Sequence, residues 1–132
     1  MSRALDPIDP GLWRRRAEWF WRAHDANAAP AAPPSDPRGE LLTAELELAF
    51  CAGAWAAVVL LAWAVVERAE RARVARGDPA PPLPEIDALR ERRNALAHDN
   101  PAVPPPDEAT LEAWAQGALR TAFGAAAAAS WR

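Results

Sequence analysis

Six residues from Arg93 to His98, with the sequence RNALAH, carry the side chains best suited to acid–base and phosphate chemistry. An imidazole exchanges protons near neutral pH, and a guanidinium offers a planar set of donors that fits a phosphate. Asn94 and His98 are four positions apart and lie on the same face of a helix. Arg93 and His98 are about 140° apart on an ideal helix. We therefore expect either that the last turn unwinds before Pro101 or that a second copy of the chain completes the site.

Arg93 also occupies an unexpected place in the helical pattern. It shares one helical face with three apolar residues, Ile86, Leu89 and Leu96. A guanidinium on that face needs a polar partner or an opening to solvent. One alternative is structural: Arg93 pairs with Glu67 or Glu70, and His98 only ends the helix.

The RNALAH segment resembles the motif of the HEPN superfamily, in which an Arg, a polar residue, three variable positions and a His follow one another. The resemblance extends over about residues 40 to 130, because a long apolar helix ending in VVERAERAR precedes the motif helix and a final helix follows it. It implies a helical bundle that cleaves RNA without a metal or another cofactor. In that reaction His98 does acid–base work, Arg93 stabilises the phosphate, and Asn94 orients His98 or binds the substrate.

The resemblance also implies partners. Family members generally dimerise with their motif helices facing each other, and Arg90 and Arg92 would extend the resulting groove as substrate-binding residues. Ordinary surface ion pairs with Asp87 or Glu91 are the other interpretation of these two arginines.

Regulation by a partner protein is a further implication of the resemblance. In some HEPN toxins a Tyr two positions after the motif His is modified by a partner nucleotidyltransferase, whereas this chain has Asn100 there and no Tyr at all. The missing Tyr argues against that modification, and sequestration by an antitoxin of nucleotidyltransferase type is an open alternative. A noncatalytic HEPN-like module that binds nucleotides or other proteins is the alternative function.

Composition predicts an all-α protein. The 132 residues include 34 alanines, the best helix former, while Tyr is absent and Val and Ile are few. The net charge of −3 gives the protein no overall positive field that would indicate nucleic-acid binding. All 15 basic residues are Arg. A single cysteine, Cys51, forms no internal disulfide, and no apolar leader precedes the first acidic residues and prolines. We expect a cytoplasmic protein.

Three clusters of prolines should interrupt the helices, at residues 30–37, 79–84 and 101–106. The predicted helices span about 10–27, 40–76, 85–98 and 107–131. Asp9 and Asp107 are the expected N-caps, and Gly77 is the expected terminator of the second helix. The prediction is one domain, 1–132, folded as an antiparallel up-and-down bundle of four or possibly five helices.

Two features of this bundle leave alternatives open. Residues 48–66 contain no charge and are long enough to span a bilayer, but alanine is frequent and two tryptophans lie toward the middle. A buried helix inside a soluble bundle is the preferred interpretation, with no membrane partner. Gly117 and Gly124 should lie on one side of the last helix, where a neighbouring backbone could approach closely.

Overall fold

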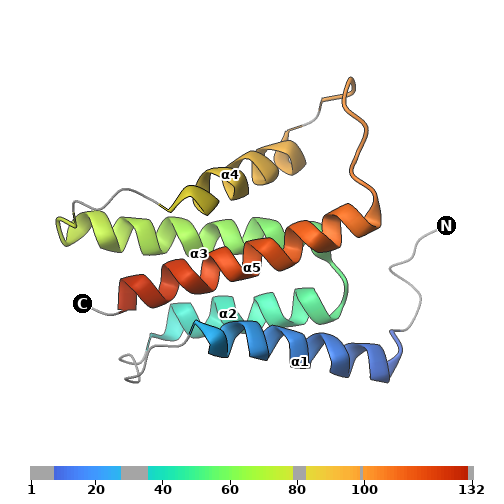
Figure 1. The fold of residues 1–132 in the computed structure, drawn as a ribbon, viewed down its shortest axis with the longest axis horizontal. Coiled ribbons are helices and arrows are strands. Elements are labelled where there is room, and N and C mark those ends of the chain that lie inside the picture. Colours follow the sequence, from blue (N-terminus) through green and yellow to red (C-terminus); the bar gives the residue numbers. More distant parts are fainter. Residues whose placement is uncertain (1–7, 28–35, 79–82, 99, 131–132) are drawn as a thin grey trace.

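The computed structural model describes residues 8–27, 36–78, 83–98 and 100–130, which form five α-helices (Figure 1). The helices are α1 (Pro10–Ala26), α2 (Pro37–Cys51), α3 (Trp55–Ala75), α4 (Pro84–Ala97) and α5 (Glu108–Ser130). No strand occurs in these four described segments, so the all-α prediction is confirmed. Three of the four predicted helices agree with α1, α4 and α5 to within one residue, and residue 131 lies outside the described residues.

The helices pack as a bundle in which consecutive helices run in opposite directions (Figure 1). Helices α3 and α5 lie side by side in the middle, with α4 on one side and α1 and α2 on the other. Helix α3 packs against α2, α4 and α5, while α5 packs against α1, α3 and α4. The two central helices therefore provide the support on which every other helix rests.

The predicted single helix over 40–76 is wrong, because a turn between α2 and α3 divides it. Gly53 has a φ of +73°, a left-handed conformation that glycine adopts without steric cost. Its N–H donates to the carbonyl of Phe50 at 3.0 Å, and the N–H of Ala54 donates to that of Ala49 at 2.9 Å. These two bonds form a Schellman motif, which ends a helix. Apolar residues continue through the turn, so hydropathy alone did not indicate the break.

The turn also divides the uncharged run over 48–66 that suggested a membrane span. Its central residues enter the protein core: Phe50, Cys51, Trp55, Val58, Val59 and Ala62 are all buried. Among the helices of the described residues, none is both long enough and apolar enough to cross a membrane. The run is therefore apolar because other helices surround it.

Many of the buried side chains on the two central helices are small. The buried alanines are Ala62 and Ala69 on α3 and Ala115, Ala118, Ala122 and Ala125 on α5. Short side chains allow two helix axes to approach closely. Toward α1 and α2 the core is aromatic: the Phe20 ring centroid lies 5.3 Å from that of Phe123, and the Phe50 centroid lies 5.3 Å from that of Trp55. The alanine excess in the sequence thus serves helix packing.

Both predicted N-caps are confirmed. The Asp9 carboxylate accepts a hydrogen bond from the N–H of Leu12 at 3.0 Å, with Pro10 at the first helical position. The Asp107 carboxylate accepts one from the N–H of Thr110 at 2.8 Å. Hydrogen bonds from Thr110 hold the pKa of Asp107 below its ordinary value.

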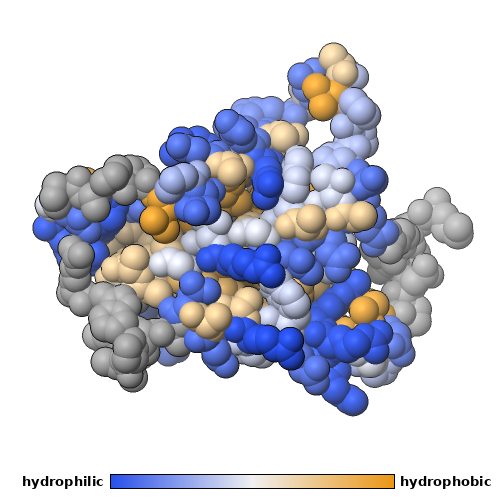
Figure 2. Space-filling view, in the orientation of Figure 1, coloured by the Kyte–Doolittle hydropathy of each residue, from blue (hydrophilic) through white to orange (hydrophobic). Residues whose placement is uncertain are grey.

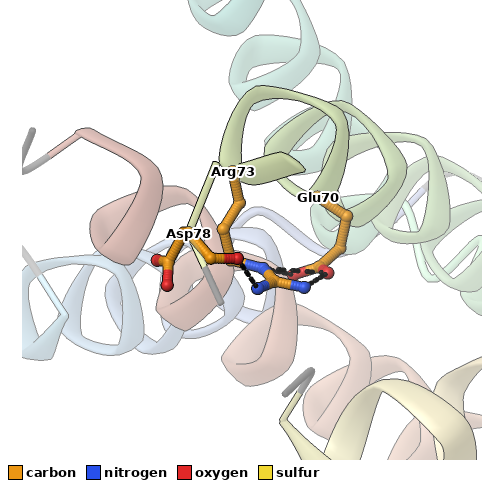
Figure 3. A network of polar contacts seen from close by, with 3 residues as sticks. All are labelled: Glu70, Arg73 and Asp78. Carbon is orange, nitrogen blue, oxygen red and sulfur yellow. Dashed lines mark hydrogen bonds and ion pairs between the residues drawn. The ribbon is translucent and has the colours of Figure 1, made fainter. Parts of the chain in front are cut away.

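Gly77 terminates helix α3, as predicted, in a second Schellman motif that follows the C-cap residue Arg76. Gly77 has a φ of +71°, its N–H bonds the carbonyl of Val74, and the N–H of Asp78 bonds the carbonyl of Arg73. The Arg73 guanidinium then joins Glu70, at 2.8 Å, to the backbone carbonyl of Asp78, at 3.2 Å (Figure 3). This network sets the direction of the chain as it leaves α3.

Candidate functional site

Helix α4 and its C-cap residue His98 carry the candidate residues, and the helix rests on the bundle through two buried side chains. Ile86 and Leu89 are buried in the core beneath it. Pro84 stands at the first helical position, and Glu85 and Asp87 lie in the first turn, where negative charge is favourable. Hydrophilic residues gather over α4 in the view of Figure 2. The helix therefore presents a polar outer surface while two apolar residues hold it in place.

His98 lies where α4 ends. Its backbone has left helical geometry, with a φ of −104° and a ψ of 128°, one residue earlier than predicted. Its N–H still donates to the carbonyl of Asn94 at 3.0 Å. The last turn of α4 therefore stays helical, and only His98 itself departs from helical geometry ahead of Pro101. The imidazole is exposed, and it has no hydrogen bond, ion pair or ring contact with the described residues.

Arg93 and Asn94 form the closest polar pair of the site. Nη1 of Arg93 donates to Oδ1 of Asn94 at 2.6 Å, and both side chains are half-buried. The guanidinium carbon lies 5.9 Å from the ring centroid of Trp63 on α3, within the range of a cation–π contact. The guanidinium on the apolar side of α4 is therefore accommodated by an aromatic ring and an amide.

The structural alternative for Arg93 is not found. Glu67 lies 3.9 Å from Arg71, and Glu70 lies 2.8 Å from Arg73, so both acids have partners on their own helix. Within the four described segments Arg93 makes no ion pair. Its positive charge is thus left available to a ligand.

Arg90 lies on the same flank of α4 as Arg93. Its guanidinium carbon is 5.5 Å from the ring centroid of Trp63, and its Nη1 is 2.8 Å from Oδ1 of Asp87. The ion pair is the surface pairing that the sequence also suggested. Both groups are exposed, and such pairs contribute little stability. The structure therefore brings Arg90 and Arg93 together on one ring.

Arg92 lies on the opposite flank, against α5. Its guanidinium carbon is 5.6 Å from the ring centroid of Trp114. Residues two positions apart on a helix are separated by about 200°, so Arg90 and Arg92 contact different helices. The geometry within one chain does not place these two arginines in a single row.

The two glycines of α5 do not admit a neighbouring backbone. A Cβ at Gly117 would lie 3.3 Å from Nη1 of Arg92, and one at Gly124 would lie 3.7 Å from Oδ1 of Asn27. In both cases the nearest atom belongs to a side chain. Gly117 thus provides room for a guanidinium, which the sequence pattern did not indicate.

The remaining reactive groups belong to the core or its margin. Cys51 is buried, and burial raises the pKa of its thiol, which disfavours a nucleophilic thiolate. The His24 ring packs edge to face on Trp21 and Phe123, 3.2 Å from Oδ1 of Asp25. Among the described residues, no three His, Cys, Asp or Glu side chains cluster as metal ligands would. Within the described segments, the candidate site is therefore confined to the α4 motif, His98 and Trp63.

Trp63 and Trp114 are aromatic neighbours of the α4 arginines that sequence analysis missed. Trp63 lies inside the apolar run of α3, and Trp114 lies on the apolar stripe of α5, where both suggest only core packing. Their contacts with arginines join residues more than twenty positions apart. No local signal indicates such pairs.

Comparison of the chain with protein-family models, with curated proteins and with solved structures finds no match.

Proposed function

We propose that this chain is a metal-independent endoribonuclease of the HEPN type, which cleaves RNA in a groove between two copies of the chain. The observation that carries the proposal is the Arg93–Asn94 pair, whose 2.6 Å hydrogen bond holds a half-buried guanidinium about one turn before the exposed His98. An antiparallel HEPN-like bundle with this motif at the end of α4 is part of the same proposal.

The proposed reaction uses the ribose of RNA as its own nucleophile. The 2′-hydroxyl attacks the adjacent phosphorus, the bond to the 5′-oxygen of the next nucleotide breaks, and a 2′,3′-cyclic phosphate forms. One proton leaves the 2′-hydroxyl and one is delivered to the departing 5′-oxygen. His98 exchanges these protons, and Arg93 stabilises the charge that grows on the phosphoryl oxygens. Asn94 holds the Arg93 guanidinium in place.

A second copy of the chain completes the proposed site. The His98 imidazole makes no contact with Arg93 among the described residues, so the acid, the base and the guanidinium do not all converge within one chain. Two motif helices facing each other bring two His98 side chains to one groove, one as acid and one as base. Control by a sequestering antitoxin, in a cytoplasmic toxin or defence system, belongs to the same proposal.

The direct test is RNA cleavage in the presence of EDTA. The His98→Ala variant should lose at least about a hundredfold in rate, the usual contribution of a general acid or base. Arg93→Ala should lose a similar amount, and the wild-type product should end in a cyclic phosphate. His24→Ala is the matched control, since that histidine lies against Trp21 and Phe123. Equal cleavage by wild type and His98→Ala, or no wild-type cleavage over several RNAs and pH values, contradicts the proposal.

A noncatalytic interaction module is the second candidate, favoured by an apolar surface on α2. Leu41 and Leu48 are 59% and 52% exposed and lie seven positions apart, on one face of the helix. This function predicts that Leu48→Glu abolishes association with a protein partner, while His98→Ala has no effect on it. If Leu48→Glu leaves the association intact and His98→Ala abolishes it, the interaction-module function is excluded.

A further inference from the structure

Two arginines of α4 share one aromatic ring of α3. The guanidinium carbons of Arg90 and Arg93 lie 5.5 and 5.9 Å from the ring centroid of Trp63. Trp63 is half-buried and packs against the core, so the helix packing holds its ring. A free arginine side chain populates many rotamers, and ordering it costs conformational entropy. A fixed ring reduces that cost before any ligand arrives.

Both guanidiniums keep donors for a ligand. Each group has five N–H donors. Among the described residues, one nitrogen of each is engaged: Nη1 of Arg90 by Asp87 and Nη1 of Arg93 by Asn94. An aromatic face attracts a cation but removes none of its charge. Asp87 is exposed, and Arg90 is its ion-pair partner among the described residues. The pair therefore retains positive charge and unfilled donors beside a partly exposed indole.

This combination matches the chemistry of a single-stranded nucleic acid. Guanidiniums bind phosphodiester oxygens, and two of them held beside one ring can contact neighbouring phosphates of one strand. We infer that Trp63 is a positioning residue that holds Arg90 and Arg93 together as one binding unit for the backbone of single-stranded RNA. The choice of RNA over DNA rests on the proposed function.

The opposite flank of α4 supplies a matched control. Arg92 stacks on Trp114 at 5.6 Å, a contact of the same kind that holds one guanidinium rather than two. Trp114 is half-buried like Trp63, so substituting it removes a similar indole without changing Trp63. A general loss of stability or of aromatic surface affects both variants, whereas the inferred role belongs to Trp63 only.

The experiment measures binding of a labelled single-stranded RNA by fluorescence anisotropy. All proteins carry His98→Ala, which prevents cleavage during the titration and makes the result independent of whether the wild type cleaves. Trp63→Leu should weaken binding about tenfold, equivalent to about 1.4 kcal/mol. Trp63→Phe, which keeps an aromatic face, should bind within about threefold of the parent. Trp114→Leu should leave the affinity unchanged.

A double-mutant cycle between Trp63→Leu and Arg93→Gln distinguishes positioning from an independent contact. If the ring acts by holding the arginine, the combined loss is smaller than the sum of the two single losses. Additive losses, or equal losses in Trp63→Leu and Trp114→Leu, overturn the inference. If the wild type does not cleave RNA, the proposed function is contradicted. The binding result stays interpretable, because the binding proteins are not required to cleave.

Nuclear magnetic resonance of the arginine Nε–H groups provides a test without any substitution at Trp63. In the protein that carries only His98→Ala, adding RNA should shift the signals of Arg90 and Arg93. The signal of Arg120 should stay constant, because that side chain stacks on Trp19 at 5.1 Å on another part of the bundle. Shifts of Arg120 alone, or of none of the three, overturn the inference even if Trp63→Leu does not fold.

Discussion

Nη1 of Arg16 on α1 donates a hydrogen bond to the backbone carbonyl of Cys51, the last residue of α2, at 3.1 Å. The two residues are 35 positions apart, so a side chain of α1 bonds the backbone at the start of the turn between α2 and α3. A cation at the C-terminal end of a helix also interacts favourably with the helix dipole. The same guanidinium lies 4.8 Å from the ring centroid of Trp55, at the start of α3.

Gly53→Ala should destabilise the protein more than Gly77→Ala. Both glycines have a positive φ, +73° and +71°, so each substitution strains the backbone by about 1 kcal/mol. At Gly53 the added Cβ would also lie 3.0 Å from Nη1 of Arg16, whereas at Gly77 it meets nothing within 4 Å. We expect a total loss of about 2 kcal/mol at Gly53, measured by urea unfolding. Equal losses at both positions would show that Arg16 moves away freely.

Ala62→Leu should destabilise the contact between the central helices. Ala62 is fully buried in the alanine-rich core of α3. Larger side chains in a close-packed core cost about 1 to 3 kcal/mol. Ala113→Leu, on the exposed side of α5, is the control and should change the unfolding free energy by less than about 0.5 kcal/mol. A stable Ala62→Leu protein would mean that the helices separate without cost.

The ion pair between Asp36 and Arg68 should make stability depend on pH in the acid range. Nη1 of Arg68 lies 2.6 Å from Oδ2 of Asp36, and a hydrogen bond from Arg68 lowers the pKa of Asp36 below its ordinary 3.8. A carboxyl with a lowered pKa in the folded state contributes stability above its unfolded pKa. That contribution disappears as the pH falls through the folded value. Asp36→Asn should therefore unfold more easily than wild type at pH 6 and equally below the folded pKa.

The control for this prediction removes the other partner. In an Arg68→Gln background, Asp36→Asn should cause a smaller loss at pH 6, because the hydrogen bond that lowers the pKa is already absent. Denaturant unfolding of the four proteins over pH 2 to 7 measures the effect. If Asp36→Asn causes the same loss in the Arg68→Gln background, a group other than Arg68 lowers the pKa of Asp36.

His98→Ala should leave the stability of the protein unchanged. The side chain is exposed and has no hydrogen bond, ion pair or ring contact with the described residues, so its removal should alter the unfolding free energy by less than about 0.5 kcal/mol. Thermal unfolding followed by circular dichroism measures this. A marked loss of stability would assign His98 a structural contact and weaken its use as a test of catalysis.

Most of the local structure was predictable because its signals act within one helical turn. Asp9 and Asp107 accept hydrogen bonds from residues three positions ahead, Gly77 ends its helix, and prolines separate the elements. The RNALAH segment was likewise placed at the end of a helix. The turn at Gly53 was missed, since apolar residues on both sides of it belong to one continuous core.

The sequence by itself determined that this is a helical protein with Arg93, Asn94 and His98 at the end of one helix. Only the tertiary structure decided which neighbours those residues have. Trp63 lies thirty positions before Arg93, and the two meet because α4 packs on α3. Helical periodicity separates Arg90 from Arg92 around α4, but it does not say which helix each one contacts. Such contacts depend on the packing of whole helices, which arises from buried surface distributed over the entire chain.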